Sequence, residues 1–223
     1  MKPALHLDDA ADPTWPADTP DTPAERRKRR IRDSIIEAAE QVFAEEGEAG
    51  LSMRRLAEKI DYSPAAIYKY FSSKDELLAT IREQFFERLM VRLQETAAPG
   101  RSEKDGFLDG MRAYVQTGID SPNHYRMAFV NFGTAEPPEG TLQYEAAVRY
   151  NEQIRAHIDS GLFREVDPVL AAKSLLASIH GLTSLMASNP DFPCCLGDDT
   201  THLTREAMIE FHIQQVFEGL ARR

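Results

Sequence analysis

Cysteine is scarce in this chain of 223 residues, since Cys194 and Cys195 are the only two and stand side by side. Neighbouring cysteines rarely form a relaxed disulfide with each other, so the sequence offers no disulfide framework. No uninterrupted apolar run approaches the roughly 18 residues that a membrane-spanning helix requires. The first residues also lack the apolar stretch of a signal peptide. These absences predict a cytoplasmic protein that does not associate with membranes.

Sequence patterns of enzymes and of metal sites are missing as well. The chain contains no glycine-rich nucleotide loop and no pairing of a nucleophile with a base. Asp198, Asp199 and His202 follow the two cysteines, but their spacing does not match a standard zinc pattern. We therefore expect no catalytic residue, no metal and no cofactor. An enzyme is the rival class to a binding protein, and nothing in the sequence favours it.

Alternation of apolar and polar residues, the mark of a half-buried strand, is absent too. Apolar residues recur instead at helical spacing almost throughout, and glycine, proline and capping residues punctuate them. The fold class that this pattern predicts is all-α. Predicted helices begin near Ile31, at Met53, at Pro64, after Ser73, before Phe107, at Pro122, near 140 and at Pro168, and a last helix contains Ile209 to Leu220.

Charge is distributed unevenly along a chain whose net charge is −10. Residues 1–24 carry a net charge of −4 and five prolines, and we expect them to be a disordered acidic tail. Residues 25–95 are neutral overall but contain RRKRRIR, with six basic residues in seven, while the remainder carries −6. A site for an anionic partner is therefore expected between residues 25 and 95. We predict two domains, one over 25–72 that contains the basic run and a helical one over 73–223.

Residues 51–71 have the pattern of two short helices joined by a tight turn at 60–62. Ser52 and Ser63 are placed as N-caps, and Pro64 stands at the first helical position, where a missing N–H costs nothing. The second of two such helices can enter the DNA major groove. Small residues at its start allow close approach to the bases, and Tyr68 and Lys69 can reach phosphates or a guanine edge. Two capped helices also occur in many all-α proteins, where tyrosines simply bridge core and solvent.

Residues at fixed spacings within this segment make its sequence pattern more specific. Residues 28–81 resemble the N-terminal domain of the TetR family of transcriptional regulators, over about a quarter of the chain. The matching positions are Ser52, Leu56-Ala57, Ser63, Ile67-Tyr68, Tyr70-Phe71, Lys74 and Leu77. Tyr62 departs from the pattern, because a small aliphatic residue is more usual there.

The resemblance implies roles for individual residues. Base-facing roles fall on Arg54, Pro64, Ala65, Ala66 and Lys69, and phosphate-facing roles fall on Ser52, Tyr68, Tyr70 and Lys74. Arg55 starts the same helix as Arg54 and is expected to face the same anion. From their place before the first helix, Arg29 and Arg30 are expected to contact phosphate or the minor groove. The alternative for the basic run is a solvated helix start.

The second half of the chain is less distinctive. SLLASIHGLTSL resembles a His-Gly motif of one subgroup of the family, and we expect Gly181 to permit close helix packing. The family implies a homodimer through the last two helices, a palindromic double-stranded DNA operator, repression, and a small-molecule effector. A mostly apolar lining suits a hydrophobic or aromatic effector. The candidate lining residues are Met111, Tyr114, Tyr125, Phe129, Phe132, Tyr144 and His180. A closed core at these residues, a helical scaffold protein without an effector, and an activator are the alternatives.

Overall fold

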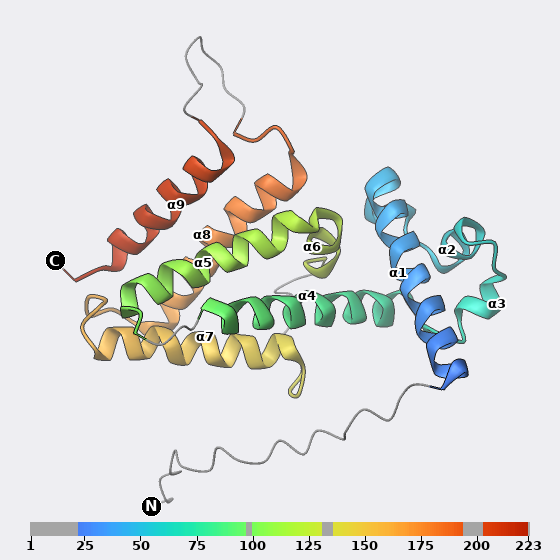
Figure 1. Cartoon of the computed structure of the whole chain (residues 1–223), viewed down its shortest axis with the longest axis horizontal. Helices are drawn as coiled ribbons and strands as arrows, with labels where there is room; N and C mark the ends of the chain where they lie inside the picture. Colours follow the sequence, from blue (N-terminus) through green and yellow to red (C-terminus); the bar gives the residue numbers. More distant parts are fainter. Residues whose placement is uncertain (1–21, 97–99, 131–135, 194–202, 223) are drawn as a thin grey trace, which may run out of the picture.

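The computed structural model describes residues 22–96, 100–130, 136–193 and 203–222, which form nine α-helices and no strand (Figure 1). Their order is α1 (Pro23–Gly50), α2 (Met53–Lys59), α3 (Pro64–Ile67), α4 (Lys74–Thr96), α5 (Glu103–Asp120), α6 (Pro122–Ala128), α7 (Leu142–Asp159), α8 (Pro168–Ser188) and α9 (Arg205–Leu220). The predicted all-α fold class is therefore confirmed.

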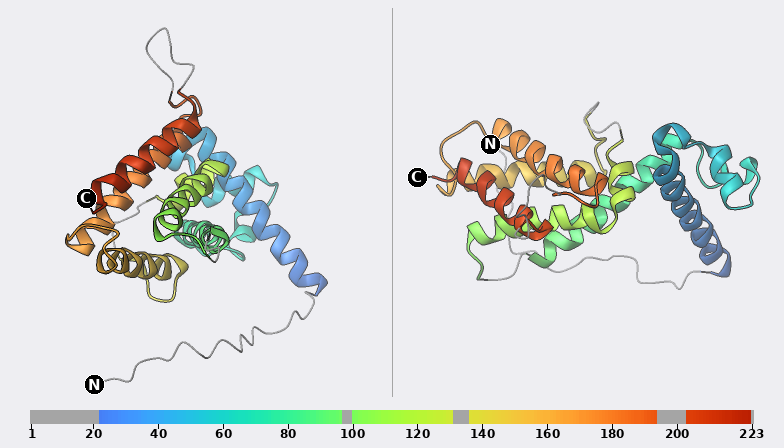
Figure 2. Two further views of the ribbon diagram at one scale, coloured as in Figure 1. Left: turned by 60° about the vertical axis from the view of Figure 1, so that its left-hand side comes forward. Right: turned by 90° about the horizontal axis from the view of Figure 1, so that it is seen from above.

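Two groups of helices lie at opposite ends of an elongated molecule. Helices α1, α2 and α3 form the smaller group, and α5 to α9 form the larger one (Figures 1 and 2). Helix α4 starts against the small group and runs into the large one, where it packs on α5, α6 and α7. The predicted boundary after residue 72 falls just before α4 begins.

The two N-caps that the sequence predicts, at Ser52 and Ser63, are present. The hydroxyls of Ser52 and Ser63 accept hydrogen bonds from the N–H groups of Arg55 and Ala66. The carboxylate of Asp167 accepts from Val169 N and Leu170 N at the start of α8. Each cap satisfies a backbone donor that the first helical turn leaves without an intrahelical partner.

Helix α1 begins earlier than predicted. Thr22 and Glu25 form a capping box, in which Thr22 N donates to Glu25 Oε2 at 2.7 Å and Glu25 N donates to Thr22 Oγ1 at 3.3 Å. The basic run thus lies on the first turns of α1 rather than on a segment before it. The helix breaks at Gly47, which has φ 69° and ψ −167°. The predicted tail overlaps α1 at residues 23–24 and includes its N-cap, Thr22, and residues 1–21, with the disorder predicted for them, lie outside the described residues.

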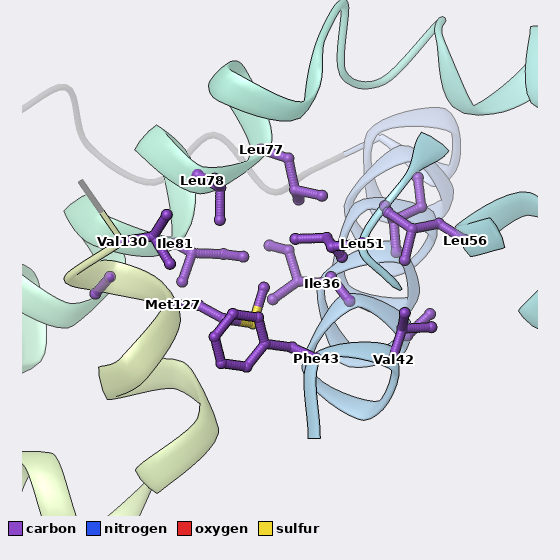
Figure 3. Packing of buried hydrophobic residues seen from close by; sticks show 14 of the residues in the cluster. Ile36, Val42, Phe43, Leu51, Leu56, Leu77, Leu78, Ile81, Met127 and Val130 are labelled. Carbon is purple, nitrogen blue, oxygen red and sulfur yellow. The ribbon is translucent and has the colours of Figure 1, made fainter. Parts of the chain in front are cut away.

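A hydrophobic cluster joins the small group of helices to α4 and α6. Side chains of α1 and α2 meet Leu77, Leu78 and Ile81 of α4, and Met127 of α6 lies beside Phe43 of α1 (Figure 3). All five side chains are buried. The core that supports α2 and α3 is therefore closed by helices of the larger group.

A second hydrophobic cluster fills the larger group between α5, α7, α8 and α9. Helix α8 is apolar and long enough to cross a bilayer, but its buried face packs on α5, α6, α7 and α9. Gly118 permits a close approach here, because an added Cβ would lie 2.3 Å from Thr183 Cγ2 and 2.9 Å from Tyr125 Cδ2. Within the single chain Gly181 does not permit such an approach, since a Cβ there would meet nothing within 4 Å.

Candidate nucleic-acid interface

Helices α2 and α3 are joined by the tight turn that the sequence predicts. Asp61 adopts a left-handed backbone with φ 56°, and Tyr62 N donates to Ala57 O at 2.9 Å. A short polar residue such as aspartate tolerates this conformation better than a bulky one. The turn sets α3 against α2, with Leu56, Ala57 and Ile67 buried between them and α1.

The start of α3 and the residues after it present an exposed surface. Pro64, Ala65 and Lys69 are exposed, Ala66 is half-buried, and the Tyr68 side chain is 52% exposed. Small residues leave the backbone accessible there, while Tyr68 and Lys69 extend hydrogen-bond donors from the end of the helix. This combination has the size and chemistry of a surface that enters a major groove.

Tyr70 and Phe71 belong to the core rather than to this exposed surface. Phe71 is fully buried, and Tyr70 packs its partly buried ring on the same cluster. Arg32 of α1 fixes this segment, because its Nη1 donates to Tyr70 O at 2.9 Å and its guanidinium carbon lies 4.3 Å from the centre of the Phe71 ring. Arg32 is thus a structural member of the basic run.

Several predicted DNA-contacting cations are paired with glutamates. Arg55 donates to Glu46 Oε1 from Nε at 3.0 Å and from Nη2 at 2.6 Å, and these hydrogen bonds raise the pKa of Arg55. Lys74 Nζ donates to Glu48 O at 3.2 Å, and its charge lies 3.8 Å from the Glu48 carboxylate.

Arg54 and Ser52 complete the predicted set on α2. Arg54 Nε lies 3.4 Å from Glu58 Oε1, and the Arg54 side chain remains largely exposed. Ser52 uses its hydroxyl as the N-cap of α2. On α1, Arg29 and Arg30 are both exposed. All described DNA-binding candidates therefore belong to one end of the molecule, on α1 to α3 and the start of α4.

Only four of the seven predicted effector residues lie together in the described part of the structure. Tyr114, Tyr125, Phe129 and His180 meet between α5, α6 and α8, where Tyr125 Oη lies 2.6 Å from His180 Nδ1. The Phe129 ring centre lies 4.6 Å from those of Tyr125 and His180. Burial raises the pKa of Tyr125 and lowers that of His180.

The other three effector candidates lie elsewhere. Met111 belongs to the second hydrophobic cluster, Tyr144 stands half-buried on the first turn of α7, and Phe132 lies outside the described residues. The cysteine pair and the residues weighed with it as a metal site also lie outside them.

The four rings pack against one another, and Tyr125 is only 1% exposed. A cavity of about 690 Å³ lies at the far end of the molecule, between the loop after α7 and the end of α9. Its lining includes Phe163, Arg164, Glu218 and Arg222, and none of the predicted effector residues. Tyr114, Tyr125, Phe129 and His180, called the ring cluster below, therefore fill the space between α5, α6 and α8 with their own side chains.

Sequence reasoning missed a contact between α1, α4 and α6. His124 of α6 is buried, with Nδ1 2.6 Å from Glu40 Oε1 and Nε2 2.8 Å from Ile81 O. Glu40 and His124 are 84 positions apart, and no local pattern marks the pair. The cap at Thr22 was also missed, although Thr-Pro-Ala-Glu has the spacing of a capping box.

Comparisons with known proteins agree with this geometry. Residues 35–81 match the family model described as bacterial regulatory proteins, tetR family. The chain is 25% identical over 156 residues to the uncharacterized HTH-type transcriptional regulator YobS of Bacillus subtilis, covering 69% of this chain and 77% of that protein. It is 26% identical over 148 residues to the HTH-type transcriptional repressor SCO4008 of Streptomyces coelicolor, covering 65% and 73%.

Solved structures share the fold over most of the chain. The TetR family transcriptional regulator PfmR of Thermus thermophilus superposes with a TM-score of 0.63 at 23% identity, covering 84% of this chain and 99% of that one. The ketosteroid transcriptional regulator KstR2 of Mycobacterium tuberculosis gives a TM-score of 0.61 at 16% identity, covering 86% and 96%.

An exposed helix-turn-helix on an all-α scaffold defines a DNA-binding transcriptional regulator. Residues 35–81 of this chain are a helix-turn-helix domain of the TetR type, and the whole chain resembles regulators of that family.

Proposed function

We propose that the protein is a homodimeric repressor that binds a palindromic operator and is released from it by a small hydrophobic or aromatic molecule. The observation that carries the DNA-binding part is the exposed start of α3, with Lys69 and the half-exposed Tyr68 directly after the helix. The printed name of SCO4008 supports repression, and activation is the alternative. Such a regulator acts in the cytoplasm, where bacterial DNA is.

The proposal divides the chain into a DNA-binding unit over residues 25–72 and an effector and dimerisation unit over 73–223. In the first unit, Arg54 and Lys69 read bases, while Tyr68, Lys74 and the exposed arginines of α1 hold phosphates. Phosphate contacts position the protein on DNA, and base contacts give specificity.

Dimerisation is supported by the outer faces of α8 and α9. Leu170 is 68% exposed and Leu185 54% exposed on α8, and Phe211 is 61% exposed on α9. Gly181 stands one turn before Leu185, with open space where its Cβ would be. Since α8 and α9 pack together, these residues suit a close helical contact with a second copy. On the opposite side of α9, Ile213 and Val216 face the monomer core.

The effector part rests on the Tyr114–Tyr125–His180 hydrogen-bonded group inside the ring cluster. Three polar groups converge within an otherwise apolar surround, which is the composition of many small-molecule sites. Because the rings fill the space, an effector would have to displace Phe129 or its neighbours. A closed core that only stabilises the fold is the alternative.

Quantitative DNA binding tests the reading surface. The probe is a duplex that the native protein enriches from a random-sequence library. Lys69→Ala and Arg54→Ala are each expected to weaken binding to it by about 1–3 kcal/mol and to relax base preference. Tyr68→Phe should weaken binding by a similar factor on all sequences, since it removes a phosphate contact.

Arg155→Ala, on the exposed face of α7, is the matched control and should leave affinity unchanged. If the native protein enriches no duplex, or if all three interface variants bind as tightly as the native chain, the assignment of this surface is wrong. A scaffold protein gives the first of these results.

A further inference from the structure

Arg32 of α1 stands apart from the other basic residues of its run. The five basic residues before it, from Arg26 to Arg30, are exposed, whereas Arg32 is half-buried. Its side chain turns to the segment that follows α3, where its Nη1 donates to Tyr70 O at 2.9 Å. Its guanidinium carbon lies 4.3 Å from the centre of the Phe71 ring. One side chain of α1 therefore holds both a backbone carbonyl and a ring of this segment.

A second hydrogen bond links the same guanidinium to α4. Its Nη2 donates to Thr80 Oγ1 at 3.4 Å, and the Thr80 hydroxyl donates its own hydrogen to Glu76 O at 3.0 Å. Donors and acceptors are therefore matched along this chain of groups. A planar guanidinium can bond in two directions while it lies on an aromatic ring, which a lysine ammonium cannot do. Arg32 thus connects α1 both to α4 and to the segment between α3 and α4.

Glu76 of α4 holds the other end of this segment. Its Oε2 accepts hydrogen bonds from Ser72 Oγ at 2.6 Å and from Ser72 N at 2.7 Å. These hydrogen bonds, together with the positive charge of Arg32, lower the pKa of Glu76. Phe71 lies between the two attachments and is fully buried. The backbone from residue 70 to residue 72 is therefore fixed from both sides.

The fixed segment determines where Lys69 points. Lys69 is exposed and directly precedes Tyr70 in the turn that follows α3. Within this turn, Lys69 N donates to Ala66 O at 3.2 Å. A hydrogen bond to a base edge weakens steeply when its donor is misaligned, whereas attraction to a phosphate charge falls off slowly with distance. Freedom in the turn would therefore reduce base discrimination more than it reduces overall attraction to DNA.

We infer that Arg32 is a positioning residue for base reading, which fixes the end of α3 through Tyr70 and Phe71 and does not itself contact DNA. The basic run then has two roles, because its exposed members face phosphates and Arg32 faces the protein. The inference rests on the proposed DNA-binding function, but not on an effector or on repression. The competing roles for Arg32 are a phosphate contact like its neighbours and support of the fold alone.

Affinities for two duplexes separate these roles. One is the selected duplex, and the other has the same base composition in scrambled order. Arg32→Lys keeps the charge but cannot make both hydrogen bonds and cover the Phe71 ring. It should lower affinity for the selected duplex about tenfold and leave affinity for the scrambled duplex unchanged. Support of the fold alone predicts a smaller active fraction, which would lower both affinities by the same factor.

Salt dependence identifies a phosphate contact. Arg32→Gln should also weaken binding to the selected duplex about tenfold, and it should keep the native slope of log affinity against log salt concentration. Arg30→Gln removes an exposed cation from the same helix. It should weaken binding to both duplexes and reduce both slopes by about 1.

Arg205→Lys is the matched control. Arg205 is also half-buried, and it donates from Nη1 to Pro190 O at 2.9 Å and from Nη2 to Met186 O at 3.2 Å, away from the DNA-binding unit. The change removes the same kind of contact and should leave both affinities unchanged.

A double-mutant cycle tests whether Arg32 acts through Lys69. Lys69→Ala already lacks the side chain that is to be positioned. Adding Arg32→Lys to it should reduce the ratio of the two affinities by less than about twofold, against about tenfold in the native background.

Three results would overturn the inference: an affinity ratio that Arg32→Lys leaves at its native value, a lower salt slope in Arg32→Gln, or additive effects in the cycle. Both Arg32 variants should have native helix content by circular dichroism at the assay temperature. If neither variant folds, Arg32 supports the fold alone and the inference is wrong. A native protein that enriches no duplex would instead overturn the proposed function.

Discussion

At the residue scale, three cations at the end of the molecule proposed to bind DNA are paired with glutamates of their own chain. The end of α1 supplies Glu45, Glu46 and Glu48, which pair with Lys59, Arg55 and Lys74. These pairs place negative charge beside a surface that is proposed to approach phosphates, so each contact with DNA competes with an internal one.

Glu46→Gln is therefore expected to strengthen DNA binding. The change leaves at most neutral hydrogen bonds where Arg55 now has two charge-assisted ones, and it removes a charge that repels phosphate. Exposed ion pairs are worth about 0.2–1 kcal/mol, so affinity should rise by a factor of about 1.5 to 5. Fluorescence anisotropy at two salt concentrations measures it, and the gain should shrink at high salt. Glu152→Gln on α7 is the matched control. Weaker binding by Glu46→Gln would mean that Glu46 orients Arg55 for DNA.

At the element scale, the question is whether the ring cluster between α5, α6 and α8 binds an effector. Phe129→Trp enlarges a side chain that contacts Tyr125 and His180. It should reduce the response to a releasing compound about tenfold or more, because the added ring fills the space an effector needs. The free energy of unfolding should also fall by about 1–3 kcal/mol, because the larger side chain overpacks the cluster. Release of the selected duplex across a panel of small aromatic molecules measures the response.

Phe107→Trp in the second hydrophobic cluster controls for overpacking alone, since it should cost similar stability and leave the response intact. If no compound in the panel releases the native protein, the ring cluster is a closed core.

The same scale shows what the sequence could predict. Starts of α2, α3, α6 and α8 were predictable because a cap or a proline acts on backbone within three residues of itself. The sequence could not predict that Gly118, and not Gly181, allows two elements to pack closely within the chain. That depends on which side chains lie opposite each glycine in the fold. Glu40 and His124 are brought together by the packing of α1 on α6, which no local spacing encodes. The role of Arg32, which holds the segment of Tyr70 and the buried Phe71, likewise depends on the fold.

At the scale of the whole molecule, the exposed faces of α8 and α9 are expected to join two copies. Phe211→Glu and Gly181→Arg should each produce a folded monomer, since Phe211 is exposed and a side chain at 181 meets open space in the single chain. Ile213→Glu is the contrasting variant and should unfold the chain, because Ile213 is fully buried. Light scattering gives the mass and circular dichroism the helix content. A native protein that is monomeric at micromolar concentration would contradict the dimer.

Paired half-sites follow from a dimer of this shape. The DNA-binding units lie at the end of each chain away from the loop joining α7 to α8 (Figure 1). Two recognition surfaces can read successive major grooves only when they are about 34–36 Å apart. In the proposed dimer, a change in the position of one unit would therefore weaken binding at both half-sites.

Helix α6 also limits how this sequence can vary in length. It has seven residues, and the neighbours His124 and Tyr125 engage different units. Successive residues of a helix are turned by about 100°. One inserted residue between them would swing one side chain to the wrong unit while the other kept its partner. Variants of this protein should therefore not accept insertions or deletions within α6, where the number of residues sets which unit each side chain reaches.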